Sequence, residues 1–266
     1  MKSDPIDLVL DIGNSRSKLA LFQGATVLRA GILEHPDLLT VQRFIDRAPV
    51  RAIAVASVGD TGPELVAALA PYSRTVLLTG QSPSPLRISY DTPETLGVDR
   101  LANSVAAASM FPGRSVLVVD IGTCITYDLV TVQNGFEGGL ISPGPYMRAQ
   151  AMHAYSARLP LIDPVTDGPL IGRSTRASLS AGVFHGIRYE IEGVVHDLRQ
   201  QASDLAVVLT GGGAPPSIAA LKIGIFADPL LTLRGSHVLL LHQLNEARGA
   251  SPAPSAGLAP GPRPGK

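Results

Sequence analysis

Short apolar runs separated by turn residues dominate the front half of the chain. Runs bounded by Gly, Asn or charged residues are typical of strands, and apolar residues spaced at three and four positions are typical of a helix. The predicted elements are strands over 6–11, 17–22 and 26–33, a helix over 37–48, a strand over 51–58, a helix over 62–72 and a strand over 75–80. This order predicts an antiparallel meander that feeds parallel crossovers.

The back half begins with the same succession. The predicted elements are strands over 116–122, 123–132 and 135–142, helices over 145–159 and 174–201, a strand over 205–213 that runs into a glycine-rich turn, and a helix start over 215–221. In the long helix, Leu179, Val183, Ile187 and Ile191 follow each other at four-residue spacing. A succession of elements that occurs twice indicates a duplicated structural unit.

The two halves meet at an Ala-rich stretch over about 100–110, which is helical by propensity and ends at Pro112-Gly113. We therefore predict one lobe over residues 1–112 and a second over 113–248. The segment 249–266 consists of Pro, Gly, Ala and Ser with almost no bulky apolar residue, so we expect it to be a disordered tail.

Composition narrows the function classes. The chain has 266 residues, with 22 Lys and Arg against 22 Asp and Glu, so net charge gives no reason to expect a nucleic-acid or anionic-membrane partner. The single cysteine fits a reducing compartment, and the N-terminus has no long apolar region or cleavage site. No run is long enough to span a bilayer. We expect a cytoplasmic protein.

Each half opens on a strand that ends in an Asp-x-Gly turn, at Asp11 and at Asp120. A strand-terminal carboxylate can hold a cation, and the tight glycine turn can present backbone N–H groups to phosphate oxygens. The alternative is a pair of ordinary hairpins stabilised by local side-chain bonds. Because two similar half-chains both open in this way, we favour two facing lobes with a nucleotide triphosphate between them.

The stretch LGVDR places Asp99 and Arg100 at the start of the Ala-rich helix. A carboxylate here could orient a hydroxyl acceptor and take its proton, and the guanidinium could pair with an anionic group. The alternative is that Asp99 is a helix N-cap and Arg100 a solvated charge. From these residues alone the alternative is slightly favoured.

In this order, DIGNSRSK, YDTPETLGVDR, DIGTCIT, GGLISPG and GRSTRASLSAG closely resemble the type III pantothenate kinase family of the acetate and sugar kinase/Hsp70/actin superfamily. The resemblance covers residues 7 to 246. It implies an α/β fold in which a βββαβαβ unit occurs twice. Each copy would form a ribonuclease-H-like lobe with a mixed five-stranded sheet, and ATP would bind in a cleft between the two lobes. It also implies transfer of the ATP γ-phosphoryl group to pantothenate at the entry to coenzyme A synthesis.

The same resemblance implies roles for individual residues. Asp99 would be the general base, and Asp120 would bind a monovalent cation, K⁺ or NH₄⁺, while Mg²⁺ would arrive with ATP. The ATP contacts would be Asp11, Ile12, Gly13, Asn14, Ser15, Arg16, Ser17, Lys18 and Thr123. The pantothenate contacts would be Tyr90, Gly97, Val98, Asp99, Arg100 and Thr175. The family forms homodimers, and Gly182 and Gly186 make the long helix our candidate for that contact.

Several alternatives stay open. Tyr90 could be a rim tyrosine that packs on Pro93, and Thr175 could be a plain helix cap. The chain could also be a regulatory accessory factor, since proteins once described as transcriptional accessory factors belong to this family, or another small-molecule kinase of the superfamily. The Asp99-Arg100 pair argues against a non-catalytic relative.

Overall fold

The computed structural model describes residues 4–13, 16–57, 61–163, 168–213 and 225–249. Several sequence predictions lie partly or wholly outside these residues: the ATP contacts Asn14 and Ser15, the last residue of the strand over 51–58, the helix start over 215–221, and the tail apart from Gly249. No helix in the described ranges combines the length and the apolar character that a membrane span requires.

The first lobe follows the predicted order of elements. It consists of β1 (Ile6–Ile12), β2 (Ser17–Gln23), β3 (Thr26–Leu33), α1 (Leu38–Ile45), β4 (Val50–Ser57), α2 (Thr61–Leu69) and β5 (Arg74–Leu78). The sheet order is β3-β2-β1-β4-β5, with β1, β2 and β3 antiparallel and β4 and β5 parallel to β1. The predicted βββαβαβ unit is confirmed here.

The second lobe repeats this arrangement. It contains β6 (Val116–Ile121), β7 (Cys124–Thr131), β8 (Gly135–Pro143), α4 (Pro145–Ala154), α5 (Thr175–Gln201), β9 (Ala206–Thr210) and β10 (Ile225–Ala227). Its sheet order, β8-β7-β6-β9-β10, places the strands as in the first lobe. The mixed sheets and the duplication are confirmed, whereas an ATP cleft between the lobes stays a prediction. The helix predicted over 145–159 ends earlier, because Tyr155 caps α4.

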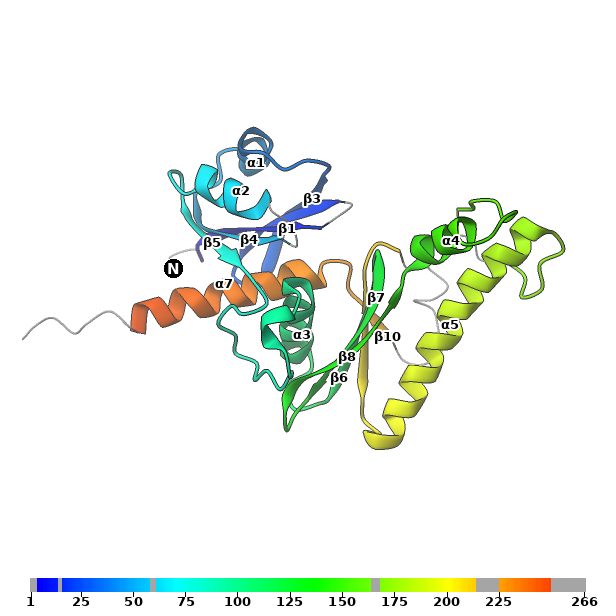
Figure 1. Ribbon diagram of the computed structural model, residues 1–266. Coiled ribbons are helices and arrows are strands. Elements are labelled where there is room, and N and C mark those ends of the chain that lie inside the picture. Colours follow the sequence, from blue (N-terminus) through cyan, green and yellow to red (C-terminus); the bar gives the residue numbers. More distant parts are fainter. Residues whose placement is uncertain (1–3, 14–15, 58–60, 164–167, 214–224, 250–266) are drawn as a thin grey trace, which may run out of the picture.

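Two helices lie between the sheets (Figure 1): α3 (Val98–Met110), preceded by the short 3₁₀ turn η1 (Pro93–Thr95), and α7 (Leu231–Gly249). The helix α7 was not predicted from the sequence. It packs on α3 and contacts β1, β2, β4 and β5. The division at about residue 112 stays a prediction, but a helix from the second range covers the sheet built from the first.

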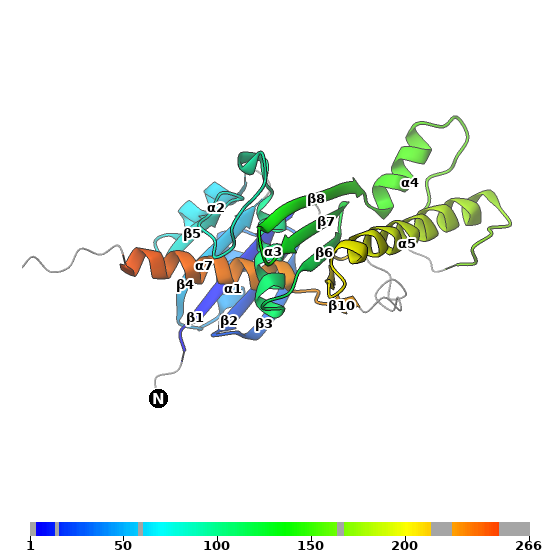
Figure 2. The same cartoon turned by 90° about the horizontal axis from the view of Figure 1, so that it is seen from below.

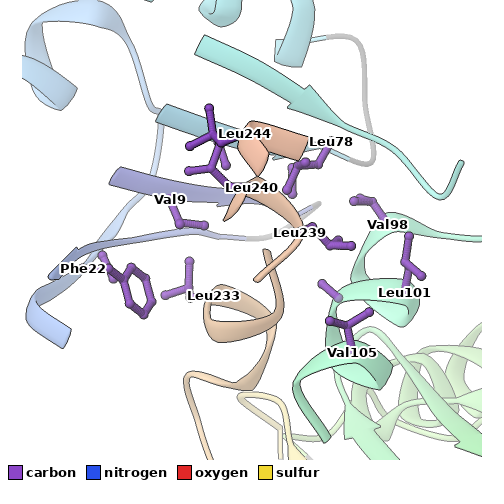
Figure 3. Close-up of a cluster of buried hydrophobic side chains, with 14 of the residues drawn as sticks. Val9, Phe22, Leu78, Val98, Leu101, Val105, Leu233, Leu239, Leu240 and Leu244 are labelled. Carbon is purple, nitrogen blue, oxygen red and sulfur yellow. The ribbon is translucent and has the colours of Figure 1, made fainter. Parts of the chain in front are cut away.

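The α7 contact is mainly apolar (Figure 3). Leu240 and Leu244 of α7 lie near Val9 and Leu78 of the first sheet, and Leu239 points toward α3. A buried polar group adds to this contact, because His237 Nε2 lies 3.0 Å from Asp7 Oδ2 on β1. That carboxylate also accepts from Arg51 Nη2 at 2.5 Å. The helix is therefore held on the first sheet by apolar packing and by a buried hydrogen bond.

The outer faces of the sheets carry the other layers. The helices α1 and α2 cover the first sheet, and α5 covers the second. Together α4 and α5 form an arm that extends away from α3 and α7 in both views (Figures 1 and 2). Each sheet therefore has one face toward α3 or α7 and one toward its own outer helices.

Candidate active site

Strand alternation brings an acid from each sheet to the inner face. Val9 belongs to the apolar cluster that includes α7, so Asp11, two residues on, faces the same side. Lys18 on β2 is the cross-strand partner of Asp11. In the second sheet, Val118 packs with Ala106 and Ala107 of α3, so Asp120 also faces α3. The two Asp-x-Gly turns thus end strands whose inner faces look toward the same pair of helices.

Asp99 is close to both acids. Burial raises the pKa of Asp11 to about 6; Lys18 opposes this shift, while the charges of Asp99 and Asp120 add to it. Burial also raises the pKa of Asp120. The hydrogen bond from Asn103 opposes this shift, and the charge of Asp99 adds to it. Three carboxylates from three separated segments of the chain therefore share one region with Lys18, and they do not lie on separate surfaces.

The N-cap alternative for Asp99 is wrong. Gly97 is the N-cap of α3, and Asp99 lies in the first turn, where its Oδ1 accepts from the backbone N–H of Arg100 at 2.9 Å. A carboxylate in the first turn is favoured by the helix dipole.

Arg100 is not a solvated charge, because only 6% of it is exposed. Its Nε and Nη2 lie 2.8 and 2.6 Å from Asp128 Oδ1 on β7. Burial alone would lower the pKa of Arg100, and the hydrogen bond and charge of Asp128 raise it above its usual value instead. The guanidinium also lies 5.6 Å from the ring of Tyr90, which packs edge-on against Phe136. The structure therefore brings the predicted residues Tyr90 and Arg100 together.

Asn103 and Asp128 were missed by the sequence analysis. Asn103 lies one helical turn after Asp99 and donates from Nδ2 to Asp120 Oδ2 at 2.9 Å. The available signals were the Asp99-to-Asn103 spacing of four in an otherwise Ala-rich helix, and an acid inside the apolar strand of Asp128. A buried acid needs a partner, and Arg100 supplies it.

The two turns use their first glycine in similar ways. Gly13 N–H donates to Arg16 O at 3.2 Å, and Gly122 N–H donates to Cys124 O at 2.9 Å. These two amide groups are therefore bonded within their own turns. Thr123 and Arg16 are exposed, whereas Ser17 is buried. Asp163 raises the pKa of Tyr146 at the start of α4, and Arg16 is close enough to oppose that shift, so the first turn approaches the second lobe.

Thr175 is not near Asp99 within this chain. It is the first residue of α5, at the outer end of the arm, and the helix cap is Ser174, whose side chain accepts from Ala177 N–H at 3.2 Å. Thr175 lines a hollow of about 540 Å³ on the arm. The other lining residues include Met152, Leu159, Arg173 and Leu179.

Comparison with known proteins concerns the family rather than the geometry of the site. A family model for type III pantothenate kinase matches residues 7–197. A type III pantothenate kinase from Bacteroides fragilis is 39% identical over 236 residues, which are 88% of this chain and 97% of that protein. One from Porphyromonas gingivalis is 36% identical over 238 residues, again 88% of this chain and 97% of that protein.

Solved structures agree on the fold. A Baf family protein from Campylobacter jejuni, described as a transcriptional activator, has a TM-score of 0.58 and 22% identity, and covers 90% of this chain and 99% of its own. The ROK hexokinase from Thermus thermophilus has a TM-score of 0.52 and 15% identity, and covers 91% of this chain and 99% of its own. At these identities the likeness concerns the fold alone. The family match and the curated relatives go further, and from them it follows that the chain belongs to the type III pantothenate kinase family.

Proposed function

We propose that this protein transfers the γ-phosphoryl group of ATP to the hydroxyl of pantothenate, giving 4'-phosphopantothenate in the first step of coenzyme A synthesis. The observation that carries the proposal is the meeting of Asp99 with Asp11 and Asp120 at the ends of two duplicated strands. Phosphoryl transfer depends mainly on positioning and on neutralising charge, and this region has the groups for both.

Asp99 has the role of general base. Its carboxylate lies at the start of α3. Among the described residues it accepts one hydrogen bond, from the backbone N–H of Arg100, so an oxygen is available to a substrate hydroxyl. Asp11, half-buried beside Lys18, suits an ion that arrives with the nucleotide phosphates. A Mg²⁺ ion bound there would neutralise the phosphate charge. The turn from Asp11 to Lys18, including Asn14 and Ser15, and Thr123 complete the proposed ATP contacts.

Gly97, Val98, Tyr90 and Arg100 form the proposed pantothenate side. The guanidinium has five N–H donors, and Asp128 Oδ1 accepts one from Nε and one from Nη2. A buried arginine that stays charged and is held in one orientation can offer its remaining donors to the pantothenate carboxylate.

We also propose a homodimer in which Thr175 of one subunit serves the site of the other. Thr175 lies on the arm, away from α3 of its own chain. On α5 a side chain added at Gly182 would meet no atom within 4 Å, and Tyr189 is 47% exposed, so this helix has a face available to a second copy.

Replacement of the base tests the function. We expect Asp99→Asn to lower turnover by roughly a hundredfold or more, the usual contribution of a general base, with a thermal stability no lower than that of wild type. Coupled detection of ADP release with pantothenate and ATP measures this. The matched control is Asp91→Asn, an exposed acid of the preceding loop. A near-wild-type rate in Asp99→Asn would remove Asp99 from this role.

The acceptor distinguishes this function from that of another small-molecule kinase. The same assay with sugars or acetate in place of pantothenate should give no ADP above the background of the enzyme with ATP alone. Release with a sugar and none with pantothenate would overturn the assignment of the substrate and leave the kinase chemistry in place.

A further inference from the structure

Two buried oxygen atoms near Asp120 have no hydrogen-bond partner among the described residues: Oδ1 of Asn103 and Oγ1 of Thr210. Only 1% of Asn103 and 3% of Thr210 is exposed. Leaving a buried polar atom without a partner costs on the order of 1–3 kcal/mol, so such atoms call for an explanation. A ligand that binds between them and Asp120 would supply one.

Strand register places Thr210 beside Asp120. The two residues are paired across the parallel strands β6 and β9, so their side chains leave the sheet on the same face. Val118 and Val208, two residues earlier on each strand, both pack against α3, which confirms that this face is the inner one. Gly211 follows with φ +96°, and a Cβ there would lie 2.6 Å from Asp120 Oδ1. The backbone therefore closes tightly around the carboxylate.

The orientation of the Asn103 amide follows from chemistry. An ionised carboxylate only accepts hydrogen bonds, so the amide atom at 2.9 Å from Asp120 Oδ2 is the donor Nδ2. The other atom, Oδ1, is then held in the same buried region as an acceptor. It can take a donor or a cation, and no donor among the described residues reaches it.

We propose that Asn103 Oδ1 and Thr210 Oγ1 are ligands, together with the Asp120 carboxylate, of the monovalent cation in this site. This inference rests on the proposed function, because the family resemblance that implies the kinase activity also implies a monovalent cation at Asp120. A set of oxygen ligands suits a hard cation, and sites for such ions are tuned by the number of ligand charges. One carboxylate with two neutral oxygens supplies a single negative charge, which matches the charge of K⁺. Thr210 and Asn103 come from β9 and α3, so a bound cation would also link these elements.

Binding of K⁺ alone to the full chain tests the ligands. Thermal unfolding is followed in rising KCl at constant ionic strength, with a large organic cation as the replacement salt, so that the stabilisation reports K⁺ affinity without turnover. We expect Thr210→Val to raise the K⁺ concentration for half-maximal stabilisation by about tenfold or more. Asn103→Leu, which removes a ligand and the bond to Asp120, should do at least as much.

Thr126→Val is the matched control. Thr126 is the partner of Asp120 on the opposite strand, β7, but its hydroxyl already donates to Asp128 Oδ2 at 3.2 Å. We expect the K⁺ concentration for half-maximal stabilisation to stay within about twofold of wild type. Melting curves in K⁺-free buffer show whether each variant folds. If Asn103→Leu does not fold, the K⁺ titration of Thr210→Val still tests the proposed ligands.

Unchanged K⁺ affinity in Thr210→Val, or an equal loss in Thr126→Val, would overturn the assignment. The titration contains no nucleotide or pantothenate, so its result is separate from that of the kinase assay. A wild-type enzyme that phosphorylates pantothenate while Thr210→Val binds K⁺ normally would reject the ligands and keep the function. An absence of turnover with pantothenate, together with the expected loss of K⁺ affinity in Thr210→Val, would reject the function and keep the ligands.

Discussion

At the scale of single residues, the site concentrates negative charge in a partly buried space. Burial and the charges of Asp99 and Asp120 make Asp11 costly to ionise, and burial and the charge of Asp99 do the same at Asp120. Lys18, and at Asp120 the amide of Asn103, offset this cost only in part. Such a region is less stable without its ligands than with them. Groups whose pKa values are shifted by burial and by a neighbouring like charge are common at functional sites.

The ionisation of Asp11 should make the free energy of unfolding depend on pH. The pKa of Asp11 is about 6 in the folded chain against the ordinary value of 3.8, so the folded state binds the proton more tightly than the unfolded state. The stabilisation from that proton is complete below the unfolded pKa and is lost as the pH rises through about 6. We therefore expect Asp11→Asn to gain stability relative to wild type by about 2 kcal/mol between about pH 4.5 and 7.5.

Urea unfolding of both proteins across this range, without nucleotide or K⁺, measures the difference in the free energy of unfolding. A difference that stays constant with pH would mean that Asp11 ionises as freely in the folded chain as in the unfolded one.

At the scale of elements, the close crossing of α3 and α7 determines where Asp99 and Asn103 lie. A Cβ added at Gly235 of α7 would overlap the backbone carbonyl of Ala102, which lies between these two site residues in α3. The helices can approach this closely only because residue 235 has no side chain. The contact is between backbones, so a rotamer change cannot relieve an added methyl group.

We expect Gly235→Ala to lower the free energy of unfolding by about 3 kcal/mol or more, since overpacking against backbone is at the upper end of such costs. The matched control is Gly193→Ala in α5, where an added Cβ meets nothing within 4 Å. It should stabilise the protein by about 0.5–1 kcal/mol through helix propensity. Denaturant unfolding measures both changes. Equal effects of the two substitutions would show that the crossing is not tight.

The elements also show how far the sequence alone could lead. The order and bounds of the first lobe were predictable because its strands are short runs with clear turns, and α5 because Val183, Ile187 and Ile191 recur at helical spacing. The helix α7 lies between α3 and the first sheet, and its buried residues are on several sides. Its partly exposed residues Arg234, His242 and Glu246 are spread along the helix among buried ones, so the pattern that marks a surface helix is weak.

The residues of the site, like the elements, were predictable only in part. Asp11 and Asp120 could be found because the turns repeat. Asp99 was assigned by the family resemblance, since the charged pair alone slightly favoured a helix cap. Asn103, Thr210 and Asp128 could not be placed, because their roles depend on which face of a strand or helix meets another segment far away in the chain. The pairing of Arg100 with Asp128 is a tertiary contact of this kind.

At the scale of the whole molecule, the two lobes share one apolar layer. Leu233, Leu239, Leu240 and Leu244 of α7 belong to the same cluster as residues of β1, β2, β4 and α3. The helix α3 packs on the second sheet through Ala106 and Ala107. The C-terminal helix thus covers the first sheet while it contacts a helix that covers the second. We expect the lobes to unfold as one unit rather than in sequence.

Leu240→Ala tests that coupling. Leu240 is fully buried against the first sheet, so its truncation should lower the free energy of unfolding by about 2–5 kcal/mol. If the lobes are coupled, amide hydrogen exchange should speed up by the same factor in peptides from β1 and from β6, which Leu240 does not contact directly. Leu28→Ala on β3, where the side chain is 48% exposed, should leave the exchange rates in β1 and in β6 unchanged. Faster exchange in β1 with unchanged exchange in β6 would mean that α7 stabilises the first lobe alone, and that the position of Asp99 relative to Asp120 is not controlled by this helix.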